Sequence, residues 1–513
     1  MSDTRGLPRK GEIMTLRLTE LDDDGLALTR IDWPLPGETR RMRVVARGGL
    51  PGDLVNVRID GRNRDTLMGR VVEVLEPAPG RIAPRCRHAA FQLEGRYCGG
   101  CTLQHLSYEG QLELKRRRVE KAFEVAGIKV PLGIAVAAPT TFGHRHKMEL
   151  SFATERLGGV LGEVQLGLHP PGLKWEVIAL EECPLTSERI SAFLPRLGRV
   201  FAKSGAHAWD PRDEHGFLRN LVVREGKRSA DVLIELLTTP LENVPTLHGE
   251  KAARELVDTL KSEILEEAHN SGIEISSLLW TVHYAERGKP TRYETTVLHG
   301  AAGMTETLRV PSPTCVDGGE VELSFAISPR AFFQPHPLAA ERLIREVHRR
   351  LPDRCRTVLD LYCGTGTLAL TIAPSAKRVL GVELVPEAIA GARENAARNG
   401  LEHCRFIAGD VEVELARLKL EEPELFAEVD AVLLDPPRSG LTPKAMEHLA
   451  SVRPPRIIYV SCKPESLGRD LRRLIEAGYR VDGEATPVDL FPHSHHVETV
   501  VALVAEPPIE VGS

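Results

Sequence analysis

The chain has 513 residues, of which 42% are hydrophobic and 27% are charged, and its net charge is −6. This length exceeds one ordinary hydrophobic core and predicts about two to four domains, while the composition is that of a globular protein. The first residues contain no apolar signal segment, and no run of about eighteen apolar residues follows. We therefore expect a cytoplasmic protein that does not insert into a membrane.

The charges are distributed unevenly along the chain. Residues 1–150 contain 25 Lys and Arg against 19 Asp and Glu, whereas the remaining residues contain 41 against 53. The amino-terminal third can therefore face phosphates, although a surplus of this size is also common on a solvated surface. The nine cysteines are odd in number and widely spread, which favours reduced thiols over a disulfide framework.

The amino-terminal segment alternates apolar and polar side chains. The alternation is clearest in residues 14–18, 42–46, 54–59 and 69–74, and turn-forming residues separate these runs. Period-two alternation with short turns predicts a small antiparallel barrel, which we assign to residues 5–76. Such barrels often bind oligonucleotides, but many do not, so the pattern alone leaves the ligand open.

Residues 77–335 are expected to form a central domain of mixed structure. Helical spacing of Leu112, Val119 and Phe123 predicts a helix over residues 108–126, beneath the basic run 115–118. Residues 134–335 are then predicted to be mainly strands. An amphipathic helix at 250–268 interrupts them, and we expect it to pack on the sheet.

The carboxyl-terminal segment, 336–508, alternates helices with short apolar strands. The strands are expected at residues 357–361, 378–382, 404–407, 431–434, 456–460 and 497–503. Helical segments between most of them predict a doubly wound, mainly parallel sheet. In such a sheet, ligands bind at the carboxyl ends of the strands.

A glycine-rich turn follows the first of these strands, in Asp360-Leu-Tyr-Cys-Gly-Thr-Gly-Thr367. Its glycines allow close approach of a ligand, and Glu383 at the end of the next strand can accept both hydroxyls of a ribose. The pattern indicates an adenosine site. Because the spacing departs from the dinucleotide fingerprint and the Walker lysine is missing, S-adenosylmethionine fits better than NAD or ATP.

Two later motifs carry the candidate chemistry. In Asp435-Pro-Pro-Arg-Ser-Gly440 the prolines hold an acidic turn rigid, as in amino-methylating enzymes, which need no thiol. Cys462, however, ends a buried strand and can add to C6 of a pyrimidine, which activates C5 for methylation. Glu498 is the candidate base for the C5 proton. The alternatives are a buried small hydrophobe for Cys462 and a surface charge for Glu498.

A separate group of cysteines lies between the barrel and the strands of the central domain. The spacing is Cys86-x11-Cys98-x2-Cys101, and Cys183 follows in Glu181-Glu-Cys-Pro184. Four thiolates of which two are closely paired suit tetrahedral zinc or an iron-sulfur cluster. The paired cysteines can also form a redox couple, but the two distant cysteines and the proline after the last favour a cluster.

Taken together, these motifs resemble the RNA uracil-5-methyltransferase family, which has tRNA and ribosomal-RNA members, over nearly the whole chain. The resemblance also covers Ser328-Pro-Arg-Ala-Phe-Phe-Gln334 and Phe491-Pro-His-Ser-His-His-Val-Glu-Thr499. It implies a multidomain α/β protein with a TRAM-like OB barrel, a central domain that binds RNA, and a Rossmann-like methyltransferase domain.

The resemblance also implies roles for individual residues. Cys462 would be the nucleophile, Glu498 the proton acceptor, and Asp435 would lie beside both the methionine end of the cofactor and the uracil. Cys86, Cys98, Cys101 and Cys183 would hold a 4Fe-4S cluster. The residues implied to line the S-adenosylmethionine and base pocket are Gln334, Tyr362, Thr367, Glu383, Asp410 and Asp435.

The chain departs from the family pattern at three places. The gap after Cys86 is eleven residues where five is familiar, Lys463 replaces the usual Asn after the catalytic cysteine, and His144-Arg-His-Lys147 replaces Tyr-Arg-Asn-Lys. These changes affect the spacing of Cys86, the strand end after Cys462 and a segment expected to contact RNA.

We therefore expect methylation of C5 of a specific uridine in RNA, with 23S rRNA favoured because the cluster-bearing relatives act there. The alternatives are a tRNA uridine-5-methyltransferase and a non-catalytic RNA-binding or iron-sulfur protein, which would have no use for the pairing of Cys462 with Glu498. We expect a monomer whose partner is RNA, with no protein partner required.

Overall fold

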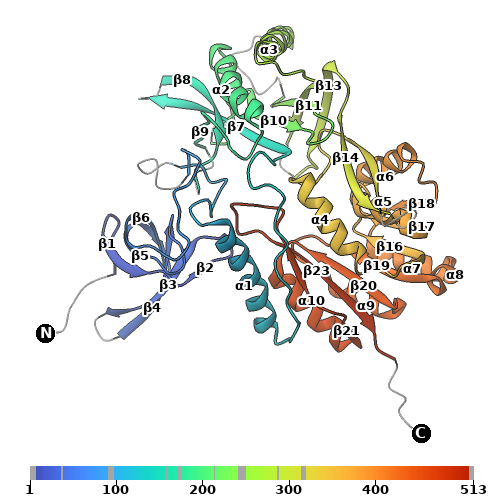
Figure 1. Ribbon diagram of the computed structural model, residues 1–513. Helices are drawn as coiled ribbons and strands as arrows, with labels where there is room; N and C mark the ends of the chain where they lie inside the picture. The colour runs from blue at the N-terminus through green and yellow to red at the C-terminus, as the bar shows by residue number, and fades with distance from the viewer. Residues whose placement is uncertain are drawn as a thin grey trace.

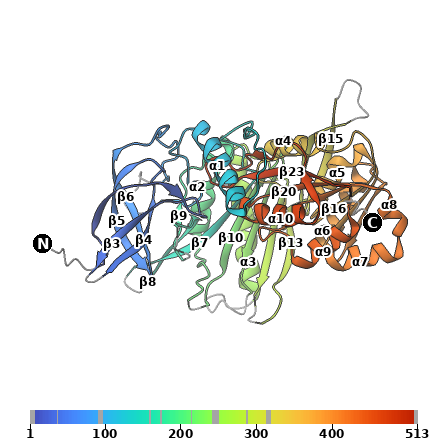
Figure 2. The same ribbon diagram turned by 90° about the horizontal axis from the view of Figure 1, so that it is seen from below.

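The computed structural model describes residues 7–35, 38–89, 97–157, 160–171, 173, 175–212, 214–240, 250–285, 288–312 and 319–507. Its strands form an amino-terminal, a central and a carboxyl-terminal sheet, together with a separate two-stranded hairpin. Figure 1 shows α1 between the amino-terminal and the carboxyl-terminal sheets, and Figure 2 shows the central sheet between them in the turned view. Among the described residues, no helix is long and apolar enough to cross a membrane.

The amino-terminal sheet has the strand order β1-β5-β6-β4-β3-β2. Alternating residues of β5 point inward, where Val55, Val57 and Ile59 are buried with Leu18 and Val44 in one apolar core. The predicted alternation is confirmed, but β4 pairs with β6 in parallel, so the sheet is not purely antiparallel. The strands are β1 (Ile13–Arg17), β2 (Glu20–Leu21), β3 (Ala27–Leu35), β4 (Glu38–Arg47), β5 (Leu54–Asn63) and β6 (Thr66–Glu76).

Helix α1 (Tyr108–Ala126) has the predicted limits because both ends are capped. The Ser107 hydroxyl accepts the Gly110 N–H at its start, and Gly127 ends it in the left-handed conformation with φ 70°. Val119 and Phe123 are buried in the core beneath the carboxyl-terminal sheet. An amino-terminal helix thus becomes part of the carboxyl-terminal unit.

The central sheet has the strand order β13-β12-β11-β10-β7-β8-β9. Helices α2 (Glu188–Lys203) and α3 (Glu250–Asn270) cover one face, with Phe193, Leu197 and Ile264 buried against it. The packing of α3 on the sheet is as predicted, whereas α2 lies where mainly strands were expected. The strands are β7 (Lys147–Leu157), β8 (Val160–Leu168), β9 (Ile178–Ala179), β10 (Leu218–Glu225), β11 (Val232–Thr238), β12 (Ser277–Tyr284) and β13 (Arg292–Gly300).

A hairpin of β14 (Met304–Pro311) and β15 (Glu320–Ile327) links the central sheet to the carboxyl-terminal one. It packs against α4 (Pro337–His348) and α6 (Pro386–Arg398). The amide side chains of Asn395 and Asn399 on α6 bond to the backbone of β15, with Asn395 Oδ1 accepting the Ala326 N–H at 2.7 Å. The hairpin is therefore fixed to the carboxyl-terminal unit.

The carboxyl-terminal sheet has the order β18-β17-β16-β19-β20-β23-β21, with β22 paired to β23. Its first five strands are parallel and β23 runs antiparallel, which confirms the predicted doubly wound, mainly parallel sheet. The strands are β16 (Cys355–Leu361), β17 (Ala376–Glu383), β18 (Cys404–Ala408), β19 (Val429–Leu434), β20 (Arg456–Ser461), β21 (Tyr479–Val481), β22 (Thr486–Val488) and β23 (Glu498–Ala505).

Helices cover both faces of this sheet, which explains why β19 and β20 are almost continuously apolar. α4, α5 (Thr367–Ile372) and α6 contribute to the core on one face. α1, α7 (Val411–Glu421), α9 (Pro443–Val452) and α10 (Pro464–Glu476) contribute to the core on the other, with α8 (Pro423–Ala427) beside α7.

Candidate active site

The candidate catalytic residues gather at the carboxyl ends of neighbouring strands. In the sheet register Leu361 pairs with both Val382 and Leu434, so Glu383 and Asp435 each follow directly on adjoining strand ends. Ser461 on β20 pairs with Thr499 on β23. Cys462 follows this pair and Glu498 precedes it, so the antiparallel strands place the two side by side although 36 residues separate them in the sequence.

Burial makes Glu498 a weak acid. The residue is 5% exposed, and burial together with the nearby Asp435 carboxylate raises the pKa of Glu498 to about 8. Burial likewise raises the pKa of Asp435 to about 7. A carboxyl group with a pKa near neutrality can both take up and release a proton under physiological conditions.

The Cys462 thiol lies half-buried at the same strand end. Burial raises its pKa to about 11, the Glu498 and Asp435 carboxylates act in the same direction, and Arg438 opposes them. The resting sulfur is therefore a protonated thiol. Nucleophilic attack requires this proton to leave, and Glu498 and Asp435 are the acidic groups beside it.

The glycine-rich turn holds the Glu383 carboxylate in place. Tyr362 takes the left-handed conformation, with φ 68°, and its N–H donates to the Val382 carbonyl at 2.9 Å. The Gly364 N–H then donates to Glu383 Oε2 at 3.1 Å, and the Val385 N–H donates to Oε1 at 3.0 Å. A side chain at Gly366, where φ is 77°, would press on Phe406, which accounts for glycine there.

The other residues predicted for the cofactor pocket approach the same turn to different degrees. The Thr365 hydroxyl donates to the Phe332 carbonyl at 3.5 Å, which brings the loop that carries the half-buried Gln334 to the turn. Thr367 begins α5. Asp410 is exposed and caps α7 through its Oδ1. Burial raises the pKa of Tyr362 to about 12, and the Glu412 and Asp410 carboxylates act in the same direction, so Asp410 lies near Tyr362.

Asp360 begins the glycine-rich motif, and the sequence alone did not indicate a role for it. It is fully buried on β16, and burial beside Asp435 and Glu383 holds its pKa well above the usual range. Burial at this position therefore disfavours the charged form of the Asp360 carboxyl group. The signal in the sequence was an acidic residue within an otherwise apolar strand next to a glycine-rich turn.

The segment that precedes Glu498 is fixed by α1. The Lys115 ammonium bonds to Asp489 Oδ1 at 2.5 Å and to the Phe491 carbonyl at 2.9 Å. The Gln111 side chain accepts the His493 N–H at 2.7 Å, and His493 is itself in the left-handed conformation. Together, these bonds fix residues 489–493, a few residues before the candidate base.

The four cysteines singled out in the sequence line one cavity of about 120 Å³. Burial is the main cause of the raised pKa of Cys98, about 12, and Cys183 and Cys86 act in the same direction. Gln104 lines the same cavity, where its Oε1 accepts the Cys86 N–H at 2.6 Å. Its buried Nε2 has no hydrogen-bond partner among the residues that the structure describes. Within the described ranges, no group of three or more His, Cys, Asp or Glu could hold a single metal ion.

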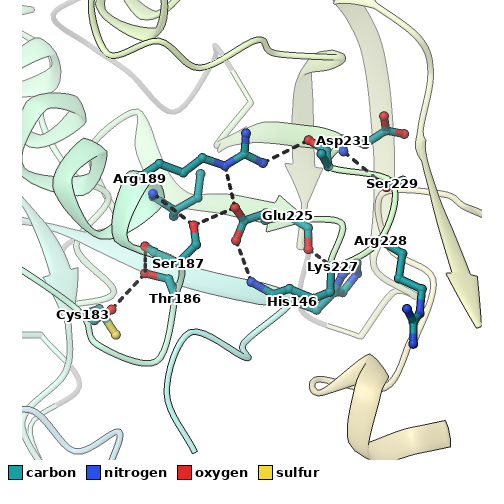
Figure 3. Close-up of polar contacts among 12 residues, drawn as sticks. His146, Cys183, Thr186, Ser187, Arg189, Glu225, Lys227, Arg228, Ser229 and Asp231 are labelled. Atoms are coloured by element: carbon teal, nitrogen blue, oxygen red, sulfur yellow. Dashed lines mark hydrogen bonds and ion pairs between the residues drawn. The ribbon is translucent and has the colours of Figure 1, made fainter. Parts of the chain in front are cut away.

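A polar network ties the Cys183 segment to the rest of the molecule (Figure 3). The Thr186 hydroxyl donates to the Cys183 carbonyl at 2.9 Å. Next to it, the Ser187 hydroxyl donates to Glu225 Oε1 at 2.6 Å, and Lys227 donates to Oε2 of the same carboxylate at 2.6 Å. Arg228 then forms an ion pair with Glu341 on α4, so the network reaches the carboxyl-terminal unit.

Comparison with known proteins places this geometry in a family. Residues 319–506 match the family described as tRNA (Uracil-5-)-methyltransferase. An uncharacterized RNA methyltransferase from Caldanaerobacter subterraneus subsp. tengcongensis is 36% identical, over 96% of this chain and 98% of the relative. One from Clostridium tetani is 32% identical, also over 96% of this chain and 98% of the relative.

A solved structure has the same architecture. The crystal structure of Pyrococcus abyssi tRNA (uracil-54, C5)-methyltransferase in complex with S-adenosyl-L-homocysteine superposes with a TM-score of 0.65 and 25% identity, covering 96% of this chain and all of that one. The chain is similar over nearly its whole length to relatives named RNA methyltransferases. Its strand ends also bring together Glu383, Asp435, Cys462 and Glu498. This chain therefore belongs to the RNA uracil-5-methyltransferase family.

Proposed function

We propose that this enzyme transfers a methyl group from S-adenosylmethionine to C5 of a specific uridine in RNA. The observation that carries the proposal is the pairing of Cys462 and Glu498 on β20 and β23, at the edge of the sheet where Glu383 and Asp435 also end. A protein that only bound RNA would have no use for a thiol and a buried carboxyl group side by side.

The cofactor is proposed to lie along the glycine-rich turn. Glu383 is positioned by two backbone N–H groups and can accept hydrogen bonds from ribose hydroxyls. Gln334, Tyr362, Thr367 and Asp410 would complete this side of the pocket, and Asp435 would lie between it and the base. The bound cofactor supplies an electrophilic methyl group. The Pyrococcus abyssi enzyme, solved with S-adenosyl-L-homocysteine, supports this choice.

The reaction follows from the chemistry of the strand ends. The Cys462 thiol passes its proton to the ionised Asp435 carboxylate beside it. The sulfur then bonds to C6 of the uracil, and the electron pair of the C5–C6 double bond moves to give an enolate. C5 then forms its bond to the methyl group while the bond between that methyl group and the cofactor's sulfur breaks, and the bonding electron pair stays on that sulfur. Glu498 takes the C5 proton, the C5–C6 double bond is restored, and the Cys462–C6 bond breaks. The target base must leave its stack to reach this site.

A 4Fe-4S cluster is proposed for the cavity lined by Cys86, Cys98, Cys101 and Cys183. The four thiols line one cavity, and a set of four cysteine ligands suits such a cluster. The Gln104 Nε2 group, which has no partner in the described part of the chain, also fits because it could donate to a sulfide. The bound group would cross-link the segments around residues 86, 98–101 and 183 and would add local charge.

We favour ribosomal RNA as the substrate, because the four cysteines resemble the cluster ligands of family members that act on ribosomal RNA. A tRNA substrate is the second candidate, and it is favoured by the solved relative, which is a tRNA (uracil-54, C5)-methyltransferase. The amino-terminal sheet is proposed as a TRAM-like barrel that contacts the RNA, with residues 5–76, 77–335 and 336–508 as the three domains.

One experiment tests the function and separates the substrates. The purified protein is incubated with methyl-labelled S-adenosylmethionine and with rRNA or tRNA from a strain that lacks the enzyme, and 5-methyluridine is mapped. Label at one uridine of the large-subunit rRNA is expected. Label in tRNA alone would shift the substrate to the second candidate, and absence of 5-methyluridine from both pools would refute the proposed reaction.

A further inference from the structure

Cationic and aromatic side chains alternate across the central sheet, on β10, β12 and β13 and on two loops beside it. Arg330 lies over the Tyr293 ring at 4.7 Å from its centroid, and the His283 ring stacks on Tyr293 at 4.7 Å with 17° between the planes. Arg219 lies over the Trp209 ring at 4.2 Å. We refer to Trp209, Arg219, His283, Tyr293 and Arg330 as the aromatic-arginine row.

Electrostatic interactions join the two halves of the row. The pKa of His283 is lowered by burial and by Arg219, and the pKa of Arg219 is lowered by burial, with an opposing contribution from Tyr293. The guanidinium of Arg219 is thus close to the stacked pair. Both effects favour the uncharged form of the His283 ring, which offers a flat surface for stacking.

The row lies on the face of the sheet opposite α2 and α3. Leu278 and Trp280 of β12 point into the core beneath those helices, so His283, at an odd number of residues from both, points to the other face. Tyr293 pairs with His283 in the register, and most residues of edge strand β13 are exposed. This part of the sheet surface is therefore accessible.

The two arginines of the row retain their charge for a ligand. Within the described chain, neither Arg219 nor Arg330 forms an ion pair with a carboxylate, and Arg330 bonds instead to the Thr295 hydroxyl at 3.1 Å. Glu294 points to the opposite face, where it contacts Arg292. A row of unpaired cations between flat rings is complementary to phosphates and bases.

The row leads to the candidate active site. Arg330 belongs to the loop that continues through Phe332, which is 68% exposed, to Gln334. The same loop is held from below by Arg224, which donates to the Pro329 and Ala331 carbonyls at 2.9 and 2.8 Å, and it contacts the glycine-rich turn through Thr365. In both views, β13 lies on the side of the central sheet toward the carboxyl-terminal sheet (Figure 1, Figure 2).

We propose that the aromatic-arginine row binds a single-stranded segment of the substrate RNA next to the target uridine, with bases stacked on Tyr293, His283 and Trp209 and phosphates on Arg219 and Arg330. The inference rests on RNA being the substrate. It adds the conformation in which that RNA is held, because stacking on side chains requires bases that are not paired in a duplex.

Binding of a fluorescein-labelled oligouridylate, measured by anisotropy, tests the proposal. Tyr293→Ala is expected to weaken binding by roughly tenfold, whereas Tyr293→Phe keeps the stacking surface and is expected to bind nearly as the parent does. Arg219→Ala combined with Arg330→Ala is expected to reduce the slope of log affinity against log salt by roughly 1 to 1.5, as expected for two lost phosphate contacts.

The matched control uses Tyr284 and Arg292, which form a similar pair at 3.9 Å on the opposite face of the same hairpin. Tyr284→Ala and Arg292→Ala are expected to leave oligouridylate binding unchanged. S-adenosylmethionine binding by each variant checks that it is folded. Cross-linking of 5-bromouridine RNA to Tyr293, His283 or Trp209, located by mass spectrometry, is the direct readout.

The outcomes separate the row from the proposed function. If the parent and the row variants bind oligouridylate equally well and the parent still methylates RNA, the proposed role of the row in RNA binding is wrong, while the proposed function stands. RNA binding that depends on the row, without 5-methyluridine formation, would overturn the function alone. Row-dependent binding of duplex RNA or of polyglutamate in preference to oligouridylate would assign the surface to a different partner and would also overturn the inference.

Discussion

Lys115 on α1 forms a buried ion pair with Asp489, in which Nζ and Oδ1 are 2.5 Å apart and each side chain is 1% exposed. The Tyr108 hydroxyl donates to the other oxygen of Asp489 at 2.9 Å. This relationship fixes the segment before Glu498 to a helix that lies more than 350 residues earlier in the chain. The candidate base is therefore positioned by a different part of the sequence from the one that contains it.

Lys115→Met is expected to destabilise the protein strongly. The change leaves the Asp489 carboxylate buried without its cation, which typically costs roughly 3–5 kcal/mol in the free energy of unfolding. Denaturant unfolding measures this loss. The double variant Lys115→Met with Asp489→Leu should recover much of it because no charge stays buried, and a double variant as unstable as the single one would contradict this account.

Glu383→Ala is expected to weaken binding of S-adenosylmethionine by about 10–100-fold, because hydrogen bonds to a charged acceptor are lost. Calorimetric titration measures the affinity. Asp410→Ala is the comparison, since that carboxylate is exposed and already bonded to the start of α7, and a smaller loss is expected there. If the Glu383 variant binds S-adenosylmethionine as tightly as the parent, Glu383 does not bind the ribose.

Cys462→Ala is expected to abolish methyl transfer while S-adenosylmethionine binding stays close to that of the parent. Glu498→Gln should instead halt the reaction after addition to C6, so that RNA stays covalently attached and the complex survives denaturing electrophoresis. Adding Cys462→Ala to the Glu498 variant should remove the complex. Cys404→Ala, on the distant edge strand β18, is the control and should methylate normally. A complex that persists without Cys462 would refute the covalent step.

The stability of the protein should depend on the protonation of Glu498. Its pKa is about 8 in the folded chain against 4.5 for an ordinary glutamate, so the folded state binds this proton more tightly than the unfolded state. The stabilisation present at low pH is thus lost as the pH rises from about 4.5 to about 8.

Glu498→Gln removes this dependence. Relative to the parent, its stability should therefore increase across that interval, by an amount on the order of 1 to 4 kcal/mol, and level off above it. Denaturant unfolding of both proteins below, within and above the interval provides the measurement. A constant difference between the two proteins would show that Glu498 titrates normally.

Cys101→Ser is expected to lower bound iron and acid-labile sulfide to a small fraction of the parent's content in protein purified without oxygen. Cys355→Ser is the control, because this buried cysteine lies on β16, away from the cavity of the four cysteines. Zinc in place of iron and sulfide in the parent would contradict the proposed cluster. Cys86→Ser tests whether Cys86, which precedes the unusual eleven-residue gap, is a cluster ligand, and the same loss of iron and sulfide is expected.

Local sequence patterns predicted the carboxyl-terminal strands well because β19 and β20 are buried on both faces and are therefore almost wholly apolar. The limits of α1 were predicted because Ser107 and Gly127 cap it. Helix α2 was missed. Its start carries a usable signal, the Ser187 hydroxyl that accepts the Ile190 N–H, but Pro195 lies within the helix, where proline is usually unfavourable.

The sequence by itself determined which residues can do chemistry and at which strand ends they lie, because a thiol or carboxylate after an apolar run is a local feature. Only the tertiary structure decided which of them meet. The antiparallel register of β20 and β23 places Cys462 beside Glu498, and burial there shifts both pKa values. The aromatic-arginine row likewise exists only because β10, β12 and β13 come together in one sheet. Such pairings depend on long-range packing, which no local pattern encodes.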